Sequence, residues 1–342
     1  SMTKKFILFI ILFFYSTNLL AENNRYFDFD KGIVALMYHR FNEEKYPSTN
    51  IQLNVFKEQL KIIENEGIQF IHPENFKKDL SKNKKQRKIL LTIDDGLLSF
   101  YENAWPILRE RKIPFILFVN TREVGSFNYM NWSQILEIHN TNYAEIGNHS
   151  HSHEYLADED PETIKSDILK SIEIFKEKLG KNSNFFSYPF GEYSVEFKKI
   201  IKELGFDYAF GQHSGVIDET KDLWELPRFP INEKYGEISR FENLVKYLPL
   251  QYNYITPEDK LIKAIDNPPN MIINFFAEQK NLDKISCYSN EGGTWEKTNI
   301  ELENNKLNIF FREKFNDRRG RINCSLRDVE GWRWLGIQFS IN

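Results

Sequence analysis

Short apolar runs alternate with segments of helical spacing over residues 32–210 of the chain. The apolar runs, which contain few charges and read as buried strands, are residues 32–39, 69–71, 89–93, 114–119, 185–188 and 208–210. Helical spacing of apolar residues marks the segments 56–63, 105–108, 164–179 and 197–204. Strands that alternate with helices pair in parallel through crossover connections, so this pattern predicts an α/β sheet or barrel.

The pattern changes after about residue 255, where the helical spacing ends. Residues 267–270, Asn-Pro-Pro-Asn, indicate a break, and Asn304-Asn305 reads as a hairpin turn. Short alternating or aromatic runs follow the break at residues 271–277, 285–288, 299–302, 307–311, 320–326 and 332–341. We therefore expect an α/β domain over residues 22–255, a linker over 256–270 and a small all-β, sandwich-like accessory domain over 271–342.

The first residues have the pattern of a secretory signal. Lys4 and Lys5 precede an apolar run from Phe6 to Tyr15, and Ala21 can end the signal. The run is shorter than the about 20 residues of a membrane span. We expect a signal peptide over residues 1–21 and a protein that is periplasmic, extracellular or associated with the cell envelope. An uncleaved N-terminal anchor, which would hold the protein at a membrane, is the alternative.

Length, charge and cysteine content further limit the domain number, the kind of partner and the state of the cysteines. The 342 residues suit one large domain and a small one, and the net charge of −4 argues against a nucleic-acid partner, which would favour a basic face. In an oxidising compartment Cys287 and Cys324 can form a disulfide, and two buried free thiols are the alternative. The sequence indicates no oligomeric state.

Residue types that carry chemistry follow the predicted strands. His39, the pair Asp94-Asp95, a histidine cluster after residue 147, the segment 189–191 and His213 each come just after an apolar run. In parallel barrels the functional site lies at the carboxyl ends of the strands. This placement is the first indication of an enzyme.

The histidine cluster and the acid pair together predict a metal site. His149 and His153 share one side of the chain whether the segment is helical or extended. With a carboxylate from elsewhere they form a two-histidine, one-carboxylate site; a solvated polar loop is the alternative. Asp94 and Asp95 repel each other unless one binds the cation, and the other can then take a proton from water.

Three motifs in this order resemble those of the polysaccharide deacetylases with a NodB-like domain, carbohydrate esterase family 4. Residues 92–96, Thr-Ile-Asp-Asp-Gly, are similar to the first motif, and residues 149–153, His-Ser-His-Ser-His, match the second. Residues 187–191, Ser-Tyr-Pro-Phe-Gly, match the third except at the first position. Residues 36–40 resemble the opening strand of exported members that act on poly-N-acetylglucosamine. The resemblance covers roughly residues 30–240.

The resemblance implies a distorted (β/α)7 barrel and a set of roles. Asp94 would be the general base, while Asp95, His149 and His153 would hold the metal, with zinc expected and cobalt or nickel as alternatives. The backbone N–H of Phe190 would help to bind the oxyanion. The residues expected at the substrate are His39, Tyr188, Pro189 and Gly191. The substrate would be an acetylated polysaccharide, and water would attack the acetyl carbonyl directly.

Two departures from the family pattern point to candidates for the charge that supports Asp94 and for the general acid. Ser187 stands where the third motif begins with an arginine that supports the catalytic aspartate, and Arg228 is expected to supply that charge from another strand; an ordinary loop arginine is the alternative. The family's late general-acid histidine has no counterpart, because no histidine follows His213. His213 is the candidate for this role from a different loop, and an ordinary polar loop residue is the alternative.

The leading interpretation is a metal-dependent deacetylase of N-acetylglucosamine units in an exported or cell-envelope polysaccharide. An O-acetyl polysaccharide esterase and a non-catalytic sugar-binding protein on the same fold are the alternatives. In the accessory domain the tryptophans that could stack on sugar rings, or else pack in a core, are Trp295, Trp332 and Trp334.

Overall fold

The computed structural model describes residues 31–82 and 85–342. The expected signal peptide, residues 1–21, lies outside the described residues. Within them, no helix has both the length and the apolar character needed to cross a bilayer.

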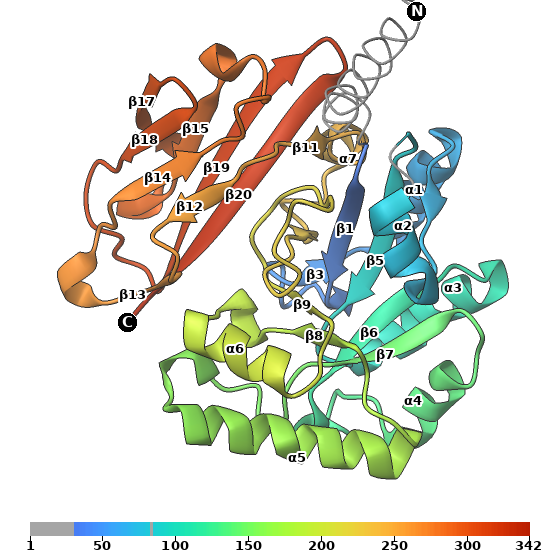
Figure 1. Ribbon diagram of the computed structural model, residues 1–342. Helices are drawn as coiled ribbons and strands as arrows, with labels where there is room; N and C mark the ends of the chain where they lie inside the picture. Colours follow the sequence, from blue (N-terminus) through green and yellow to red (C-terminus); the bar gives the residue numbers. More distant parts are fainter. Residues whose placement is uncertain (1–30, 83–84) are drawn as a thin grey trace, which may run out of the picture.

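A parallel, curled sheet forms the first layer of the molecule (Figure 1). Seven strands follow the path β10-β1-β5-β6-β7-β8-β9, and β4 pairs with β5 off this path. Their bounds are β1 (Ile33–Tyr38), β4 (Gln69–Phe70), β5 (Lys88–Ile93), β6 (Phe115–Val119), β7 (Ala144–Asn148), β8 (Phe185–Ser187), β9 (Tyr208–Phe210) and β10 (Phe229–Pro230). The strands β1, β5 and β6 are buried at every position, as in parallel sheets that are covered on both faces. The predicted α/β barrel type is confirmed.

Helices cover the outside of this sheet (Figure 1). They are α1 (Leu53–Asn65), α2 (Phe76–Lys82), α3 (Trp105–Arg111), α4 (Trp132–His139), α5 (Pro161–Leu179), α6 (Val195–Glu203) and α7 (Ile238–Leu244). In α5, Asp160 caps the N-terminus by accepting a hydrogen bond from the N–H of Thr163, and Gly180 ends the helix at a φ of 83°. Its predicted apolar face is buried at Ile164, Ile168, Ile172 and Phe175.

Short turns and a small strand pair complete the first layer and shape its loops. The pair consists of β2 (Arg40–Phe41) and β3 (Asn50–Ile51). The short helical turns are η1 (Pro73–Asn75), η2 (Phe100–Ala104), η3 (Thr121–Glu123), η4 (Leu156–Asp158) and η5 (Pro189–Gly191).

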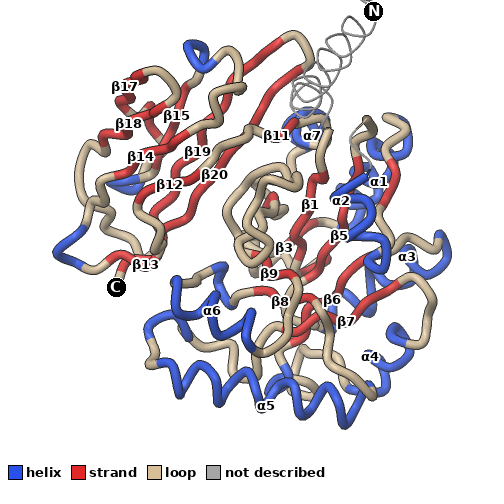
Figure 2. The backbone as a smooth tube through the Cα atoms, viewed as in Figure 1, coloured by secondary structure: helices blue, strands red, loops and turns tan. Residues whose placement is uncertain are grey.

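The C-terminal part consists of two sheets, and strand and loop dominate it in Figure 2. One sheet has the order β11-β20-β19-β15-β16 with β13 beside β20, and the other has the order β12-β14-β18-β17. The bounds are β11 (Leu248–Pro249), β12 (Tyr254–Thr256), β13 (Leu261–Ile262), β14 (Met271–Asn274), β15 (Ser286–Ser289), β16 (Glu296–Lys297), β17 (Asn299–Glu303), β18 (Lys306–Phe310), β19 (Arg319–Asp328) and β20 (Gly331–Ile341). One apolar cluster takes buried residues from both sheets, as expected for a sandwich.

The segment expected to be a linker, residues 256–270, carries regular structure. It contains β13, which pairs with β20, and the short helix η6 (Ala264–Asp266). Two further short helices, η7 (Leu282–Lys284) and η8 (Glu291–Gly293), lie later in the chain. The domain boundaries given above stay a prediction.

Cys287 and Cys324 form a disulfide, so the bridged alternative is the one that the structure contains. The two residues lie opposite each other on the antiparallel strands β15 and β19. The bridge therefore joins two neighbouring strands of one sheet across 37 residues of sequence.

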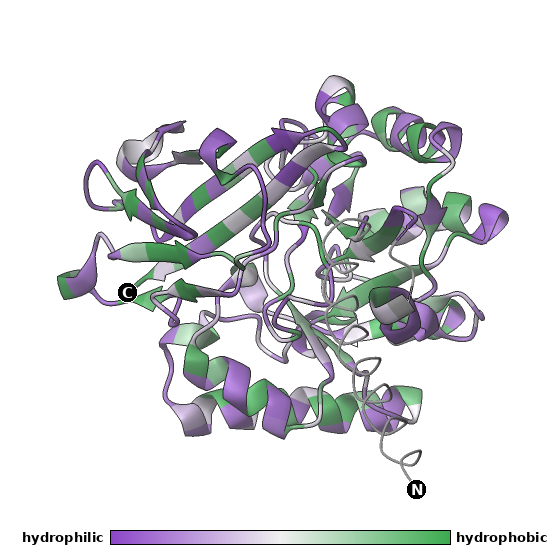
Figure 3. Cartoon of the chain, turned by 45° about the horizontal axis from the view of Figure 1, so that its top comes forward, coloured by the Kyte–Doolittle hydropathy of each residue, from purple (hydrophilic) through white to green (hydrophobic). Residues whose placement is uncertain are grey.

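The long hairpin β19–β20 presents alternating apolar and polar residues, visible along its strands in Figure 3. Its polar face packs on the barrel. Trp334 stacks on Tyr247 with ring centroids 4.9 Å apart, and its Nε1–H donates to Ser214 Oγ at 2.8 Å. Gly336 allows the close approach, because a Cβ there would lie 2.4 Å from the carbonyl oxygen of Ser214.

We expect Gly336→Ala to lower the free energy of unfolding by about 1–3 kcal/mol, because the added methyl group overpacks the contact between the two parts. Urea unfolding of both proteins measures this difference. Ser325→Ala, which adds no atom on the same face of the sheet, should change stability by no more than about 0.5 kcal/mol. Equal stabilities for Gly336→Ala and the unmodified protein would contradict the close packing described here.

Candidate metal and catalytic site

The acid pair sits where β5 ends, and the backbone separates its two side chains. The N–H of Asp94 donates to the carbonyl of Tyr38 at 2.9 Å, which extends the pairing of β5 with β1 by one residue. Asp95 then adopts a φ of 79° and Gly96 a φ of 71°. A left-handed aspartate is uncommon, and such strained residues concentrate at functional sites. After this turn Asp94 Oδ2 and Asp95 Oδ1 lie 3.9 Å and 3.2 Å from His149 Nε2.

The histidine cluster follows β7 in a compact loop that is neither helical nor extended. Ser150 and His153 have φ values of 72° and 55°. The loop is closed by local hydrogen bonds, in which Asn148 Oδ1 accepts from the N–H of Ser150 at 3.0 Å and Ser150 Oγ accepts from the N–H of His153 at 3.0 Å. This conformation brings the rings of His149 and His153 to a centroid distance of 4.8 Å.

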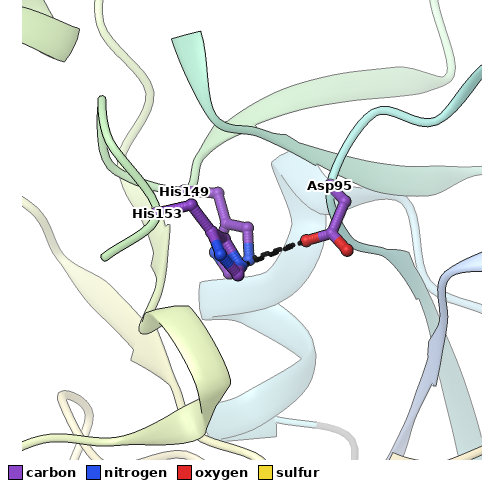
Figure 4. Close-up of side chains that lie close together, drawn as sticks. All are labelled: Asp95, His149 and His153. Carbon is purple, nitrogen blue, oxygen red and sulfur yellow. Dashed lines mark ion pairs between the residues drawn. The ribbon is translucent and has the colours of Figure 1, made fainter. Parts of the chain in front are cut away.

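Asp95, His149 and His153 form one cluster of possible metal ligands (Figure 4). Asp95 Oδ1 lies 3.2 Å from His149 Nε2 and 3.3 Å from His153 Nε2. All three ligand atoms lie within 4.8 Å of one another. The set supplies two imidazoles and one carboxylate, which is a donor set that zinc binds while keeping a coordination position open.

The tautomer of His149 supports this interpretation. Its Nδ1 lies 2.7 Å from the carbonyl oxygen of Ser187, which can only accept, so Nδ1 carries the proton and Nε2 of the neutral ring is an acceptor. Nε2 therefore faces Asp95 Oδ1, a second acceptor, and both atoms are buried with no hydrogen-bond partner among the described residues. A cation between the two acceptors resolves this conflict, so these residues fit a divalent metal.

Asp94 is held by Arg228 in a fully buried ion pair. Arg228 Nη1 donates to Asp94 Oδ1 at 2.7 Å and Nη2 donates to Asp94 Oδ2 at 2.9 Å, with both residues 0% exposed. Nη2 also donates to Ser187 Oγ at 2.8 Å, and Nε donates to the carbonyl of Gly211 at 2.9 Å. Arg228 thus places its guanidinium group against Asp94 and Ser187, from just before β10, a strand other than the one that precedes the third motif.

Two opposing effects act on the pKa of Asp94. Burial alone would raise it, but the positive charge of Arg228 and the hydrogen bonds that Arg228 donates outweigh burial and hold the pKa of Asp94 below its usual range. Asp94 is therefore ionised at neutral pH.

The third motif contributes Phe190 to a cavity next to the cluster. The cavity has a volume of about 390 Å³ and is lined by Asp95, His153 and Phe190 among others. Phe190 has a φ of 60°, and its ring lies 4.7 Å from that of His153. Such a volume is within the range of about 300–1,000 Å³ typical of small-molecule sites.

The other residues of this motif next to Phe190 are buried and packed within the fold. Tyr188 is 0% exposed, packs in an apolar cluster and donates its hydroxyl hydrogen to the carbonyl of Trp224 at 2.9 Å. The structure thus gives the Tyr188 side chain a packing position in place of the expected substrate contact. Pro189 and Gly191 are buried as well, and a Cβ at Gly191 would lie 2.4 Å from Gln212 Cβ.

His39 and His213 both line the cavity, but their surroundings differ. His39 Nε2 lies 3.9 Å from Asp94 Oδ2, and burial lowers the pKa of His39. The Nε2–H of His213 donates to the carbonyl of Glu225 at 3.0 Å, and burial lowers the pKa of His213 to about 4. His151, by contrast, turns away from the cluster and bonds to Thr121 Oγ1 at 2.9 Å.

The accessory module supplies cavity residues that the sequence analysis missed. Arg319, Arg321 and Asn323 on β19 line the cavity opposite the barrel loops. Their alternation with buried apolar residues is visible in the sequence, but it reads equally well as a solvated face. Of the three tryptophans considered above, Trp295 lines the cavity, Trp332 is exposed, and Trp334 packs between the two parts.

Comparison with known proteins gives a consistent family signal. Residues 81–209 match the family model for polysaccharide deacetylase. The poly-beta-1,6-N-acetyl-D-glucosamine N-deacetylase of Staphylococcus aureus strain MRSA252 is 24% identical over 245 residues, which cover 64% of this chain and 83% of that protein. The protein of the same name from Staphylococcus epidermidis is 24% identical over 254 residues, which cover 66% of this chain and 86% of that protein.

Solved structures extend this likeness to the fold. IcaB from Ammonifex degensii is 26% identical with a TM-score of 0.57, and the match covers 63% of this chain and 97% of that chain. The deacetylase PplD of Streptococcus pyogenes, solved in complex with acetate, is 25% identical with a TM-score of 0.55 and covers 59% of this chain and 93% of that chain. Each of these matches leaves about a third or more of the present chain outside it.

We expect Arg228→Met to lower the free energy of unfolding by about 3–5 kcal/mol, because it leaves the Asp94 carboxylate buried without a counter-charge. The double variant Asp94→Asn, Arg228→Met should recover part of this loss. Urea unfolding at one fixed metal content measures all three proteins, and Arg327→Met, at an exposed position, is the matched control. A double variant no more stable than Arg228→Met would argue against the ion pair.

We expect His153→Ala to weaken zinc binding by more than about 100-fold, beyond the 10–100-fold loss seen when a supporting residue is removed. His151→Ala should bind zinc as the unmodified protein does, because His151 lies outside the cluster. Calorimetric titration of zinc into chelator-treated protein measures both. Equal losses in the two variants would refute the ligand assignment.

Proposed function

Because this chain carries a polysaccharide deacetylase domain of the NodB type, we propose that it removes acetyl groups hydrolytically from N-acetylglucosamine units of an exported or cell-envelope polysaccharide, with the help of a divalent metal ion. One observation carries the proposal. A buried, ionised aspartate, Asp94, lies directly beside a three-ligand cluster that fits a metal, and the cluster opens into a cavity.

The choice of N-acetylglucosamine is supported by the relatives, whose names assign them poly-beta-1,6-N-acetyl-D-glucosamine N-deacetylase activity. The proposed export rests on the signal pattern of residues 1–21, with periplasmic, extracellular or cell-envelope placement as the expected result. The proposed partner is therefore an acetylated polysaccharide of the periplasm, the extracellular space or the cell envelope. The names of the relatives support the polysaccharide, and the signal pattern supports its location.

A divalent cation, zinc by preference with cobalt or nickel as alternatives, would be held by Asp95, His149 and His153 and would polarise the acetyl carbonyl and lower the pKa of water. Asp94 is the proposed general base, and its carboxylate accepts the proton of the attacking water. Arg228 keeps this carboxylate ionised and fixes its orientation through two parallel hydrogen bonds. Arg228 is therefore a positioning residue.

The tetrahedral stage of the reaction places negative charge on the former carbonyl oxygen. Phe190 lines the cavity beside His153, and we assign its backbone N–H to the stabilisation of this oxygen. Because the donor is a main-chain group, the left-handed conformation of Phe190 and not the identity of its ring would set the position of the hydrogen bond.

The leaving amine needs a proton, and two cavity histidines are candidates for the donor. His213 commits its Nε2 proton to the carbonyl of Glu225, and with a pKa of about 4 its Nδ1 is unprotonated at neutral pH. His39 Nε2 lies 3.9 Å from Asp94 Oδ2, a separation that one water can bridge. This geometry favours His39 over His213 for returning the proton that Asp94 accepts.

The direct test is acetate release from a panel of poly-N-acetylglucosamine oligomers, chitin oligomers, peptidoglycan and acetylated xylan by zinc-loaded protein. We expect release from an N-acetylated member and its loss after treatment with a chelator. Release from acetylated xylan alone would instead favour an O-acetyl esterase. No release from any member, with one metal bound per chain, would favour a non-catalytic sugar-binding protein.

Asp94→Asn should lower kcat by about 10²–10⁴-fold on the active substrate, because it removes the base and leaves the three metal ligands in place. Acetate release and zinc titration are measured on the same preparation, so that lost turnover is separated from lost metal. Unchanged turnover would contradict the role of Asp94.

A further inference from the structure

The cavity beside the metal cluster has a cationic wall. Three arginines line it, namely Arg240 from α7 and Arg319 and Arg321 from β19. Asp95 is the one carboxylate that lines it within residues 31–82 and 85–342, and a metal ion would neutralise that charge. Because the whole chain has a net charge of −4, this positive wall is a local feature of the cavity.

The strand β19 places Arg319 and Arg321 on this wall by alternation. Ile322 and Cys324 point into the sandwich core and are each 1% exposed, whereas Arg319 and Arg321 lie on the opposite face of the strand, toward the barrel. Arg321 Nε donates to Gln338 Oε1 at 3.1 Å, which fixes the side chain against β20. Gln338 in turn donates to the carbonyl of Phe190 at 3.1 Å, so the wall is tied to the third motif.

Arg319 and Arg321 lack a counter-charge. Within the described part of the chain, no carboxylate lies within 4.0 Å of either guanidinium group, although most other partly buried arginines have one, for example Arg318 with Glu192 at 2.7 Å. Burial and the neighbouring charge of Arg319 both lower the pKa of Arg321. Two like charges held together in a partly buried place are unfavourable, and a bound anion would offset that cost.

Aromatic residues border the same wall. Trp295 lines the cavity with 37% of its surface exposed, and Phe190 lines the barrel side. Flat aromatic faces pack against apolar ring faces, while arginine forks bind carboxylate or phosphate oxygens in pairs. The cavity therefore combines a surface suited to a sugar ring with donors suited to an anion.

We propose that this arginine wall recognises a negatively charged substituent, a carboxylate or a phosphate, on the glycan that carries the acetyl group. The inference rests on the proposed deacetylation and narrows its substrate to an acidic polysaccharide. Arg319 and Arg321 are then specificity-determining residues supplied by the accessory module. Neutral poly-N-acetylglucosamine would leave both guanidinium groups without their partner.

A binding experiment tests anion recognition by the arginine wall independently of turnover. Zinc-loaded Asp94→Asn protein is titrated calorimetrically with a hyaluronan octasaccharide, which alternates N-acetylglucosamine with glucuronate, and with the same oligosaccharide after reduction of its carboxylates to alcohols. An oligomer of N-acetylglucosamine phosphate is the second anionic probe. We expect at least one anionic probe to bind about tenfold or more tightly than the reduced one, with a preference that shrinks at high salt.

Matched variants locate the preference. Adding Arg319→Gln and Arg321→Gln should reduce the ratio of anionic to neutral affinity to near one. Arg327→Gln, an exposed arginine on the same strand and outside the cavity, should keep the ratio of the parent protein. Equal affinities for all three probes in the parent protein, or a preference that survives loss of Arg319 and Arg321, would overturn the proposal.

Acetate release by the protein with Asp94 intact separates this inference from the proposed function. No acetate from these probes or from the panel of substrates given under the proposed function would contradict the deacetylase proposal, while the affinity ratio would still show whether Arg319 and Arg321 recognise an anion. Acetate released equally well from neutral and anionic probes, together with equal affinities, would refute anion recognition by Arg319 and Arg321. The deacetylase proposal would still stand. Whichever anionic probe is preferred identifies the carboxylate or the phosphate as the recognised group.

Discussion

Asp94 stays ionised at zero exposure because Arg228 meets it with two hydrogen bonds. A lone buried carboxylate would take up a proton, and then it would be no base at neutral pH. The same guanidinium group also reaches Thr92 at the end of β5, Ser187 at the end of β8 and the backbone after β9. One side chain therefore fixes the relative positions of three strand ends, and the geometry of the metal cluster depends on those positions.

The metal cluster depends on a second interaction, in addition to the contacts of Arg228. Asp95 and His149 direct unpartnered acceptors at each other, an arrangement that only a cation or a proton makes favourable. The left-handed residues Asp95, Ser150, His153 and Phe190 all belong to the loops that build the site. Part of the strained backbone thus lies at the site, and the buried strands β1, β5 and β6 beneath it supply the rigid support that holds such strain in place.

Much of this arrangement could be predicted from the sequence, because it depends on local patterns. The apolar runs gave the parallel strands, and the spacing of His149 and His153 indicated the cluster. Arg228 could be proposed only as a candidate, since its partner lies 134 residues away. The packing of Tyr188 and the cavity positions of Arg319 and Arg321 could not be derived, because both depend on which face of a strand meets the rest of the fold.

Asp95, His149 and His153 are proposed to hold a metal, and Arg228 is proposed to keep the neighbouring Asp94 from binding it. Anomalous diffraction at the zinc absorption edge, from crystals grown with zinc, tests this most directly. We expect one strong peak at about 2.0–2.2 Å from Asp95 Oδ1 and from Nε2 of both histidines, with Arg228 still bound to Asp94. A peak coordinated by Asp94, or no peak at this cluster in zinc-saturated crystals, would contradict it.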